Sequence, residues 1–494
     1  MNSKACQKAD TQKAASENGH PSRVLPLSLG GIVLASLILR GLCSGGELWL
    51  DEIITLNLVR GLRHPWEILT NVLHDNNHLF NSLWMWFCGE TAQAWLHRLP
   101  SIIFGPISVY LLARSMRILG EPVVGLIWAL FVGTSYVFVL ATSEARGYSL
   151  EVLCATLCFD AIVRLLKTPY SLRAARSFGI YASLGILAHA SFFLFLGPAA
   201  MWLIWTWKGT SVSTLTRKAV YTAVLPPMVI TLAMTMLFYP HMIIGGAPIA
   251  PYLDVGITTL SVAVGGEALS DSNKSVSIIA YLVAAFTAAL ALTELALWRR
   301  ESSPIPSLVG AILIAPPIVV LLLQPEFILP RYFLIALLFL YLLGARLVVR
   351  LTTSGIAGKI AGTLLVSLFV FFNTKTTLRL WQQGRSHFVE IFQVIVATTA
   401  EDERTVGGAQ DIQNSYRLAY ACAVDPKLGS ITYVKDVRNT PTPPNFMIWE
   451  TLDQYEQMPT RWTSKQGTIY ERIAEYSAVP LNGSATFVYR RVDR

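Results

Sequence analysis

The stretch GELWLDEIITLNLVR, residues 46–60, places two adjacent carboxylates, Asp51 and Glu52, shortly after an apolar run. That run, residues 24–43, has the length of about 20 residues that a helix needs to cross a bilayer. Carboxylates are costly to keep near lipid, so ionisable residues at a membrane boundary are by default candidates for function. What these two acids could do depends on the class of the protein.

Composition indicates a membrane protein with many spans. Of the 494 residues, 53% are hydrophobic and 14% are charged, whereas soluble chains carry about 25% charge. The net charge of +8 could suggest a nucleic-acid partner, but the lysines and arginines separate apolar segments instead of forming a basic patch. The six cysteines form no CxxC pair of the kind that binds metal. The chain is therefore predicted to bind membrane and no nucleic acid.

Eleven apolar segments are predicted to span the membrane, although the fifth and sixth could instead be one long helix with a re-entrant piece. With the N-terminus inside, the inner connections hold 18 lysines and arginines and the outer ones hold 7. Cytoplasmic loops are enriched in these residues, so the N-terminus is predicted to be cytoplasmic. The segments are residues 24–43, 97–117, 122–141, 148–166, 177–192, 193–207, 218–239, 276–298, 304–324, 331–349 and 356–373.

Two other regions are predicted to lie on the outer face. The segment HLFNSLWMWFCG, residues 78–89, is too short to cross, so 44–96 should form one outer loop that includes an interfacial helix. From residue 374 the composition becomes polar, with strand patterns in SITYV and ATFVYRRV and a helical pattern in TLDQYEQMP, 451–459.

The fold class is therefore predicted to be all-α and polytopic, with about 11 transmembrane helices and a small C-terminal α/β domain. A cytoplasmic tail, 1–23, precedes the transmembrane domain, 24–373, and the soluble domain, 374–494, is extracytoplasmic. We expect the plasma (inner) membrane.

Charged and aromatic residues from distant segments gather at the predicted outer ends of the spans. They come from HDNNH (74–78), HRLPS (97–101), SEARGYSL (143–150) and PRYF (330–333), as well as from the acidic pair. Their convergence at one membrane depth predicts a common site. The candidate catalytic residues are Asp51 and Glu52, and the candidate residues for binding the donor or its phosphate are His74, His78, Arg98, Arg146, Tyr148, Arg331 and Tyr332.

These residue types suit the transfer of a sugar from a lipid-linked phosphate. A carboxylate can take the proton of an acceptor hydroxyl as that oxygen attacks. Arginines can hold a phosphate with two hydrogen bonds each and neutralise the charge that builds on it as it leaves. The lipid chain would lie between helices, and an in-line displacement of this kind inverts the anomeric centre. The predicted activity is that of an inverting hexosyl- or pentosyltransferase.

The order of these motifs resembles the GT-C membrane glycosyltransferases, in particular the protein O-mannosyltransferases, the lipid A aminoarabinose transferases and their bacterial relatives. The resemblance covers about residues 24–350 and rests on LWLDE, HDNNHLFNSLW, RLPSIIFG, SEARGYSL and PRYFLIAL. It implies a polyprenyl-phosphate sugar donor, a glycan, lipid or protein acceptor in the cell envelope, Asp51 as the catalytic base and Arg98 as a site residue. The segment His-Asp-Asn-Asn-His-Leu departs from the His-Pro-Pro of many relatives.

Other readings of the same residues stay open. Asp51 and Glu52 could simply cap the following helix, and Arg98, Arg146 and Arg331 could reach for lipid headgroups at the ends of spans. His74 and His78 have the spacing of a divalent-metal site on one helical face, but no third ligand is identifiable, so a divalent metal is possible but not expected, and no other cofactor is indicated. A transporter or lipid flippase is the alternative function, although the two similar halves common in transporters are not evident.

Overall fold

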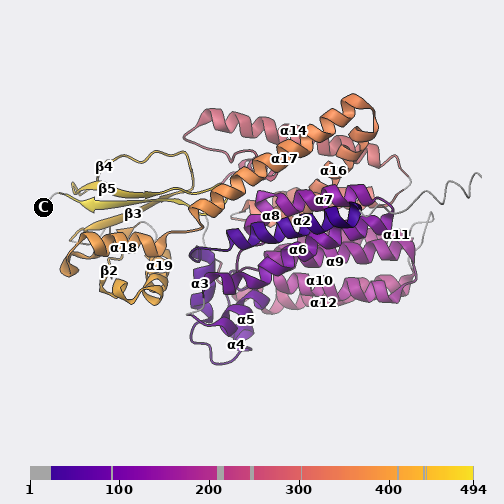
Figure 1. Ribbon diagram of the computed structural model, residues 1–494. Coiled ribbons are helices and arrows are strands. Elements are labelled where there is room, and N and C mark those ends of the chain that lie inside the picture. The colour runs from indigo at the N-terminus through magenta and orange to yellow at the C-terminus, as the bar shows by residue number, and fades with distance from the viewer. Residues whose placement is uncertain are drawn as a thin grey trace, which may run out of the picture.

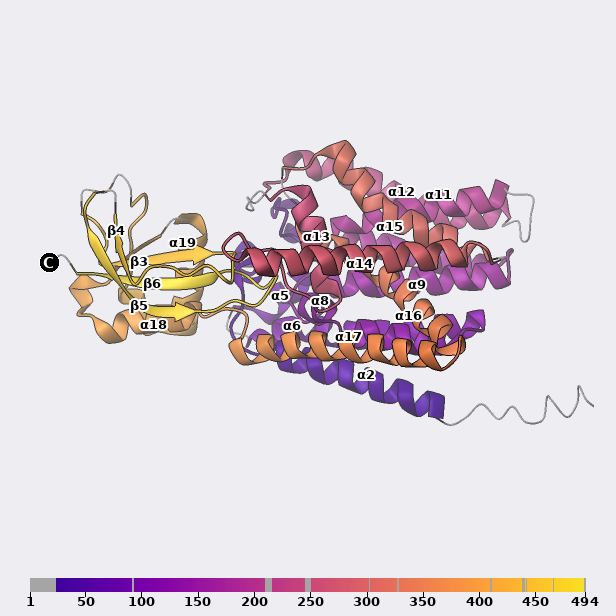
Figure 2. The same ribbon diagram turned by 90° about the horizontal axis from the view of Figure 1, so that it is seen from above.

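The computed structural model describes residues 24–90, 93–208, 216–244, 250–301, 303–326, 328–408, 411–437, 440, 442–464 and 466–492. The predicted cytoplasmic tail, 1–23, lies outside them. Figure 1 shows a bundle of long, roughly aligned helices with a small sheet domain at one end, and Figure 2 shows the same arrangement from above. The helices α3 to α5 lie at the bundle end that faces this domain.

Each predicted span coincides with one or two helices. Among the described residues, seven helical segments are long and apolar enough to cross a membrane, so the chain is an integral membrane protein, and the count of eleven crossings remains a prediction. The helices are α2 (Val24–Cys43), α6 (Ala94–Leu119), α7 (Pro122–Thr134), α8 (Tyr136–Ala141), α9 (Tyr148–Lys167), α10 (Leu172–Ala188), α11 (Phe193–Lys208), α12 (Arg217–Leu237), α14 (Lys274–Trp298), α15 (Ile305–Leu323), α16 (Leu334–Thr353) and α17 (Ile356–Gln383).

One predicted span is broken, and an alternative left open for another region is resolved. The third is broken at Ser135, whose side chain caps α8 and lies 2.8 Å from the Tyr341 hydroxyl. Residues 177–207, for which one or two helices were possible, form two helices, α10 and α11. The 3₁₀ turn η1 (Ala190–Phe192) separates them and brings His189 to the bundle end that carries the loops.

The first loop folds as a compact layer on the end of the bundle. It contains α3 (Leu50–Val59), α4 (Glu67–Thr70) and α5 (Leu79–Cys88). The ten-residue helix α5 matches the short helix expected over 78–89. Helix α3 packs against α5 and against α19 of the C-terminal domain, so the loop joins bundle and domain. A further short helix, α13 (Tyr252–Ala263), follows the 3₁₀ turn η2 (Tyr239–His241) and has no counterpart among the predicted elements.

The C-terminal domain is a mixed six-stranded sheet with two helices. The strand order is β2-β1-β3-β6-β5-β4, in which β1 pairs parallel with β2 and β3 and the other pairs are antiparallel. The predicted α/β class is confirmed, and the strands expected in SITYV and ATFVYRRV are β2 and β6. The elements are α18 (Phe388–Thr398), η4 (Glu401–Glu403), β1 (Thr405–Gly408), α19 (Asp411–Val424), η5 (Pro426–Ser430), β2 (Thr432–Tyr433), β3 (Phe446–Thr451), β4 (Arg461–Thr463), β5 (Ile469–Tyr476) and β6 (Ala485–Arg491).

Two expectations about this region are corrected. Helix α17 continues through residue 374, where the soluble domain was expected to begin, and ends at Gly384, whose φ of 74° suits glycine. The helix predicted over 451–459 is wrong, because β3 runs to Thr451 and a turn follows. In that turn Asp453 accepts hydrogen bonds from Tyr455 N at 3.0 Å and from Ser272 N at 2.9 Å. These contacts replace the helical hydrogen bonds that the sequence pattern suggested.

Candidate functional site

A cavity of about 2340 Å³ lies where the bundle, the first loop and the C-terminal domain meet. Loops and helix ends from all three contribute lining residues, which come from the segments 49–51, 74–79, 137–146, 186–194, 319–326, 328–334 and 476–484. One side is apolar, with Val137, Leu140, Ile186, Leu194 and Val320. A polar part contains Asp51, Arg146 and Arg331, and residues of the sheet domain from Tyr476 to Ser484 also line the cavity. The cavity therefore combines apolar and polar surface.

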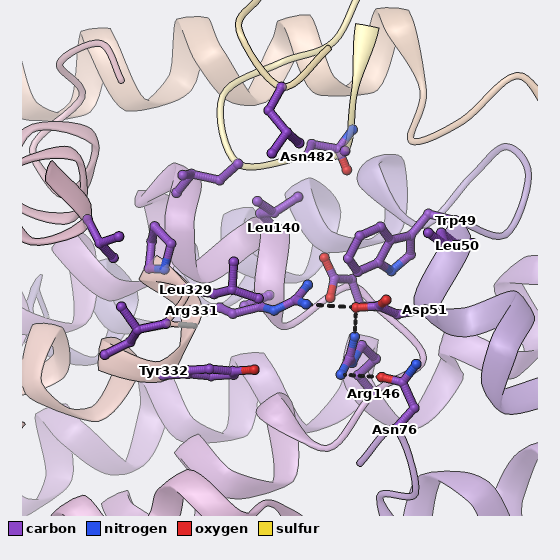
Figure 3. Close-up of a pocket in the computed structure, with 18 of the residues that line it drawn as sticks. Trp49, Leu50, Asp51, Asn76, Leu140, Arg146, Leu329, Arg331, Tyr332 and Asn482 are labelled. Atoms are coloured by element: carbon purple, nitrogen blue, oxygen red, sulfur yellow. Dashed lines mark hydrogen bonds and ion pairs between the residues drawn. The ribbon is translucent and has the colours of Figure 1, made fainter. Parts of the chain in front are cut away.

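Asp51 lies at the centre of the polar part, in the first turn of α3 (Figure 3). Its Oδ2 pairs with Nη2 of Arg331 at 2.8 Å and also with Nη1 of Arg146. The Trp49 ring covers both arginines, with the two guanidinium carbons 5.2 and 5.9 Å from its centroid. The Asp51 side chain is 15% exposed, so it reaches the cavity while both guanidiniums hold it.

The segment HDNNH holds Arg146 in place. Asn76 Oδ1 accepts a hydrogen bond from Arg146 Nη2 at 3.0 Å, and His78 Nε2 lies 2.9 Å from the same nitrogen. Because arginine can only donate, His78 Nε2 must accept and be unprotonated. Burial, followed by the charge of Arg331, lowers the pKa of His78 to about 4. His78 therefore acts as a neutral support for the guanidinium.

Glu52 and Arg98 pair with each other behind the cavity wall. Arg98 Nε donates to Glu52 Oε1 at 2.9 Å, and Arg98 Nη2 lies 2.5 Å from Glu52 Oε2. Neither side chain is exposed. Burial alone raises the pKa of Glu52, but the charge and hydrogen bonds of Arg98 outweigh it and hold that pKa below its usual value. Of the expected site residues, these two and Tyr148 lie outside the lining of the cavity.

A second buried acid, Glu144, does line the cavity. Its Oε1 accepts from Arg385 Nη1 at 3.0 Å, and its Oε2 has no hydrogen-bond partner among the described residues. Burial raises the pKa of Glu144 to about 7, although Arg385 opposes the shift. Arg385 also donates to Cys43 O at 3.1 Å and so ties the start of the C-terminal domain to the end of α2.

The remaining expected residues surround the same centre. Tyr332 lines the cavity below Arg331, and its hydroxyl points toward Arg146 (Figure 3). Tyr148 is buried with its ring 5.3 Å from the Arg146 guanidinium carbon. His74 lines the cavity, with Nδ1 2.7 Å from Asp75 Oδ1. His74 and His78 thus face different partners, and no group of three potential metal ligands occurs within the described part of the chain.

Gly147 allows the EARGY segment, residues 144–148, to pack closely against the end of α10. A Cβ built on Gly147 would lie 2.0 Å from the backbone oxygen of Ala188 at the end of α10 and 3.2 Å from the Cβ of His78. Only glycine leaves room for this approach, which brings Arg146 beside His78. The glycine thus sets the position of its neighbour in the sequence.

No model of a known protein family matches the sequence, and no curated protein matches it. Solved structures do match. ArnT from Cupriavidus metallidurans in the apo state aligns over 95% of this chain and 98% of its own, with 10% identity and a TM-score of 0.50. The chain has the ArnT fold. The GT-C resemblance seen in the sequence is therefore confirmed for the fold.

Two further matches are weaker. ArnT bound to undecaprenyl phosphate aligns over the same shares of both chains, with 11% identity and a TM-score of 0.47. The Archaeoglobus fulgidus oligosaccharyltransferase, solved with a tethered acceptor peptide, aligns over 84% of this chain with 9% identity and a TM-score of 0.47. This chain spans 64% of that oligosaccharyltransferase, less than two thirds of its length.

Several residues of the site in this ArnT-like fold were missed by the sequence analysis. Trp49 and Asn76 contact the arginines, and Arg385 holds Glu144. Trp49 and Asn76 lie within motifs that were identified, so adjacency to Asp51 and His78 could have suggested them. Arg385 lies in a linker that showed no motif, and only its tertiary contacts reveal it.

Proposed function

We propose that this protein is an inverting glycosyltransferase that moves a sugar from a polyprenyl-phosphate donor to an acceptor hydroxyl on the outer face of the membrane. The single observation that carries the proposal is the Asp51 carboxylate held between Arg146 and Arg331 at the wall of the large cavity. It combines a candidate base with two candidate phosphate ligands. The ArnT fold and the GT-C motifs support the same class of reaction.

The paired state of Asp51 suggests how donor binding would prepare the base. A donor phosphate would compete with Asp51 for the two guanidiniums, which can each bind phosphate with two hydrogen bonds. Asp51 would then be released toward the acceptor. The acceptor hydroxyl would give its proton to Asp51 as its oxygen forms the bond to the anomeric carbon. The bond from that carbon to the phosphate oxygen would break, leaving a polyprenyl phosphate on Arg146 and Arg331.

The shape of the cavity supports this assignment of ligands. Its apolar side, formed by helix residues such as Leu140, Ile186 and Val320, suits a polyprenyl chain. Its polar side reaches residues of the C-terminal domain, including Asn482 above the ion pair (Figure 3). The acceptor would enter there. Glu52 and Arg98 would support the loop that carries Asp51 without touching either substrate.

Lysine substitutions test whether the two arginines bind phosphate or only anchor helix ends. Lysine keeps the charge but loses the planar fork that binds phosphate with two hydrogen bonds. We expect Arg146→Lys and Arg331→Lys to fold normally yet lower kcat for sugar transfer by about tenfold or more, because the contact strengthens as the phosphate leaves. Transfer would be measured with radiolabelled polyprenyl-phosphate sugars in detergent.

Arg173→Lys is the matched control, because Arg173 is an exposed residue at the start of α10, away from the cavity. It should leave transfer unchanged. If all three variants match wild type, the arginines are anchors and the phosphate is held elsewhere. If no polyprenyl-phosphate sugar is turned over by wild type and only ordinary phospholipid copurifies, the transporter alternative gains support.

Cysteine labelling tests the proposed orientation. Lys427 in η5 of the C-terminal domain and Arg173 are both exposed. With the domain on the outer face, an impermeant maleimide added to intact cells should label Lys427→Cys above the background of the parent chain. Arg173→Cys should be labelled only after the membrane is opened. The reverse pattern would place the site on the cytoplasmic side and contradict the proposal.

A further inference from the structure

A third buried carboxylate, Glu151 in α9, lies next to the cavity without an arginine or lysine beside it. Its Oε1 lies 2.6 Å from the Ser191 hydroxyl oxygen, which lies 2.7 Å from Nδ1 of His189. All three residues are buried. Glu151 Oε2 has no hydrogen-bond partner among the described residues, and His189 is the nearest group that could carry positive charge, at 3.9 Å. Burying an ionised carboxylate without a counter-charge costs free energy, so the protonation state of Glu151 depends on where the protons of this cluster lie.

The hydrogen bonds limit where those protons can lie. The backbone N–H of Ser191 donates to His189 Nδ1 at 3.1 Å, so Nδ1 accepts and the neutral ring carries its proton on Nε2. The Ser191 hydroxyl has one hydrogen, which it gives to Glu151 Oε1 when Glu151 is ionised, or to His189 Nδ1 when Glu151 is protonated. In the latter arrangement its oxygen accepts a proton from Glu151, which is consistent with a protonated, neutral carboxyl group. When Glu151 is protonated, the chain of donors therefore runs from Glu151 through Ser191 to His189.

His189 connects this cluster to the proposed phosphate site. It lines the cavity, and because Nδ1 faces Ser191, Nε2 is the nitrogen left for a ligand. Its ring stacks on His78 with a centroid distance of 4.6 Å, and His78 in turn contacts Arg146. The ring of His78 therefore lies between His189 and the Arg146 guanidinium, which binds Asp51.

We propose that Glu151, Ser191 and His189 form a proton relay that makes His189 cationic when a phosphate occupies the cavity. The Glu151 proton moves to Ser191 Oγ as the Ser191 hydroxyl proton moves to His189 Nδ1. The imidazole becomes an imidazolium that keeps its Nε2–H and no longer accepts from Ser191 N, and Glu151 becomes a carboxylate, so the net charge of the cluster does not change. Nε2–H then donates a charge-assisted hydrogen bond to a phosphate oxygen.

The relay rests on the proposed function, because it assigns His189 to the phosphate of the donor and of the released polyprenyl phosphate. His189 is the contact residue, and Glu151 and Ser191 are positioning residues. The relay forms the imidazolium together with the Glu151 carboxylate 3.9 Å away, and this negative charge opposes the repulsion from the nearby arginines. The charged and titratable groups around His189 are Glu151 and Tyr148 of α9, His78, Arg146, Arg331 and Tyr332.

The test measures the affinity for undecaprenyl phosphate at pH 6 and pH 8 by quenching of tryptophan fluorescence in detergent. Glu151→Gln keeps a hydrogen-bond donor toward Ser191 but cannot release a proton. His189 must then take its proton from solvent, and protonating a neutral imidazole becomes about tenfold harder for each pH unit above its pKa. We expect Glu151→Gln to bind at least about tenfold more weakly than wild type at pH 8, with a smaller gap at pH 6.

Asp160→Asn is the control, since Asp160 is another buried acid of α9 that pairs with Arg164 away from the cavity. It should follow wild type at both pH values. If Glu151→Gln does not fold, Ser191→Ala is the alternative variant. It removes the hydroxyl that the relay needs but keeps the backbone N–H that donates to His189 Nδ1. It should show the same pH-dependent loss of affinity.

Equal affinity of Glu151→Gln and wild type at both pH values would overturn the relay and leave the cluster as a cap for η1. A wild type that does not bind undecaprenyl phosphate at either pH would overturn the proposed function itself, and the relay with it. The two failures are therefore distinguishable.

Discussion

Asp51→Asn is expected to lower the rate of sugar transfer by about 10²–10⁴-fold, the usual contribution of a positioned general base. The amide keeps the shape of the side chain but removes most of its basicity. Donor binding should be unchanged or tighter, because Asp51 pairs with Arg146 and Arg331 in the absence of donor and would no longer compete for them. The measurement is kcat together with the Kd for undecaprenyl phosphate.

Asp254→Asn is a suitable comparison, since Asp254 lines the same cavity but contacts the Tyr281 hydroxyl, at 3.3 Å, instead of an arginine. It removes one negative charge from the cavity without removing the proposed base. Near-normal turnover in Asp51→Asn would refute the assignment of the base. Equal losses in both variants would mean that the charge of the cavity matters and not the identity of Asp51.

Glu52→Gln is expected to act on stability, although Glu52 is the immediate neighbour of Asp51. The two Glu52 oxygens accept from Arg98, from Ala145 N at 2.6 Å and from Trp49 N at 3.0 Å. A glutamine would turn an N–H₂ group toward these donors and leave Arg98 buried without a counter-charge. Removing one partner of a buried ion pair typically costs about 3–5 kcal/mol. We therefore expect a clear loss of folded protein, measured by size exclusion and thermal unfolding in detergent.

Glu90→Gln provides the contrast in the same loop, because the pair of Glu90 with Arg60 is exposed. Exposed pairs contribute at most about 1 kcal/mol, so this variant should unfold like wild type. If Glu52→Gln instead folds normally and loses only transfer, Glu52 belongs to the reacting site and not to its support.

The acidic pair shows how much of the site could be predicted from the sequence. The apolar run before it and the motifs after it were enough to predict a helical membrane protein of the GT-C type, since apolar length and motif order are linear properties of the chain. The same linear view could not divide the roles of Asp51 and Glu52. Helix α3 turns successive residues by about 100°, so one carboxylate faces the cavity and the other faces Arg98.

Elsewhere, contacts between distant segments of the chain limited what could be predicted from the sequence. The helix expected over 451–459 is absent because Asp453 bonds to Ser270 and Ser272, about 180 residues earlier in the chain. Arg385 could not be assigned to the site because its partners are distant in the sequence: Cys43 ends α2, and Glu144 lies in the turn between α8 and α9. A local pattern carries no information about partners of this kind.

By itself the sequence determined the membrane class, the helical segments, the α/β class of the C-terminal domain and the set of polar residues at one end of the bundle. Hydrophobic length and periodicity act locally, so they can be read along the chain. The tertiary structure decided which of those polar residues share a cavity. Arg146 and Arg331 both pair with Asp51, whereas Arg98 pairs with Glu52. Burial and pairing depend on which helix ends meet in space, and that packing is a property of the whole fold.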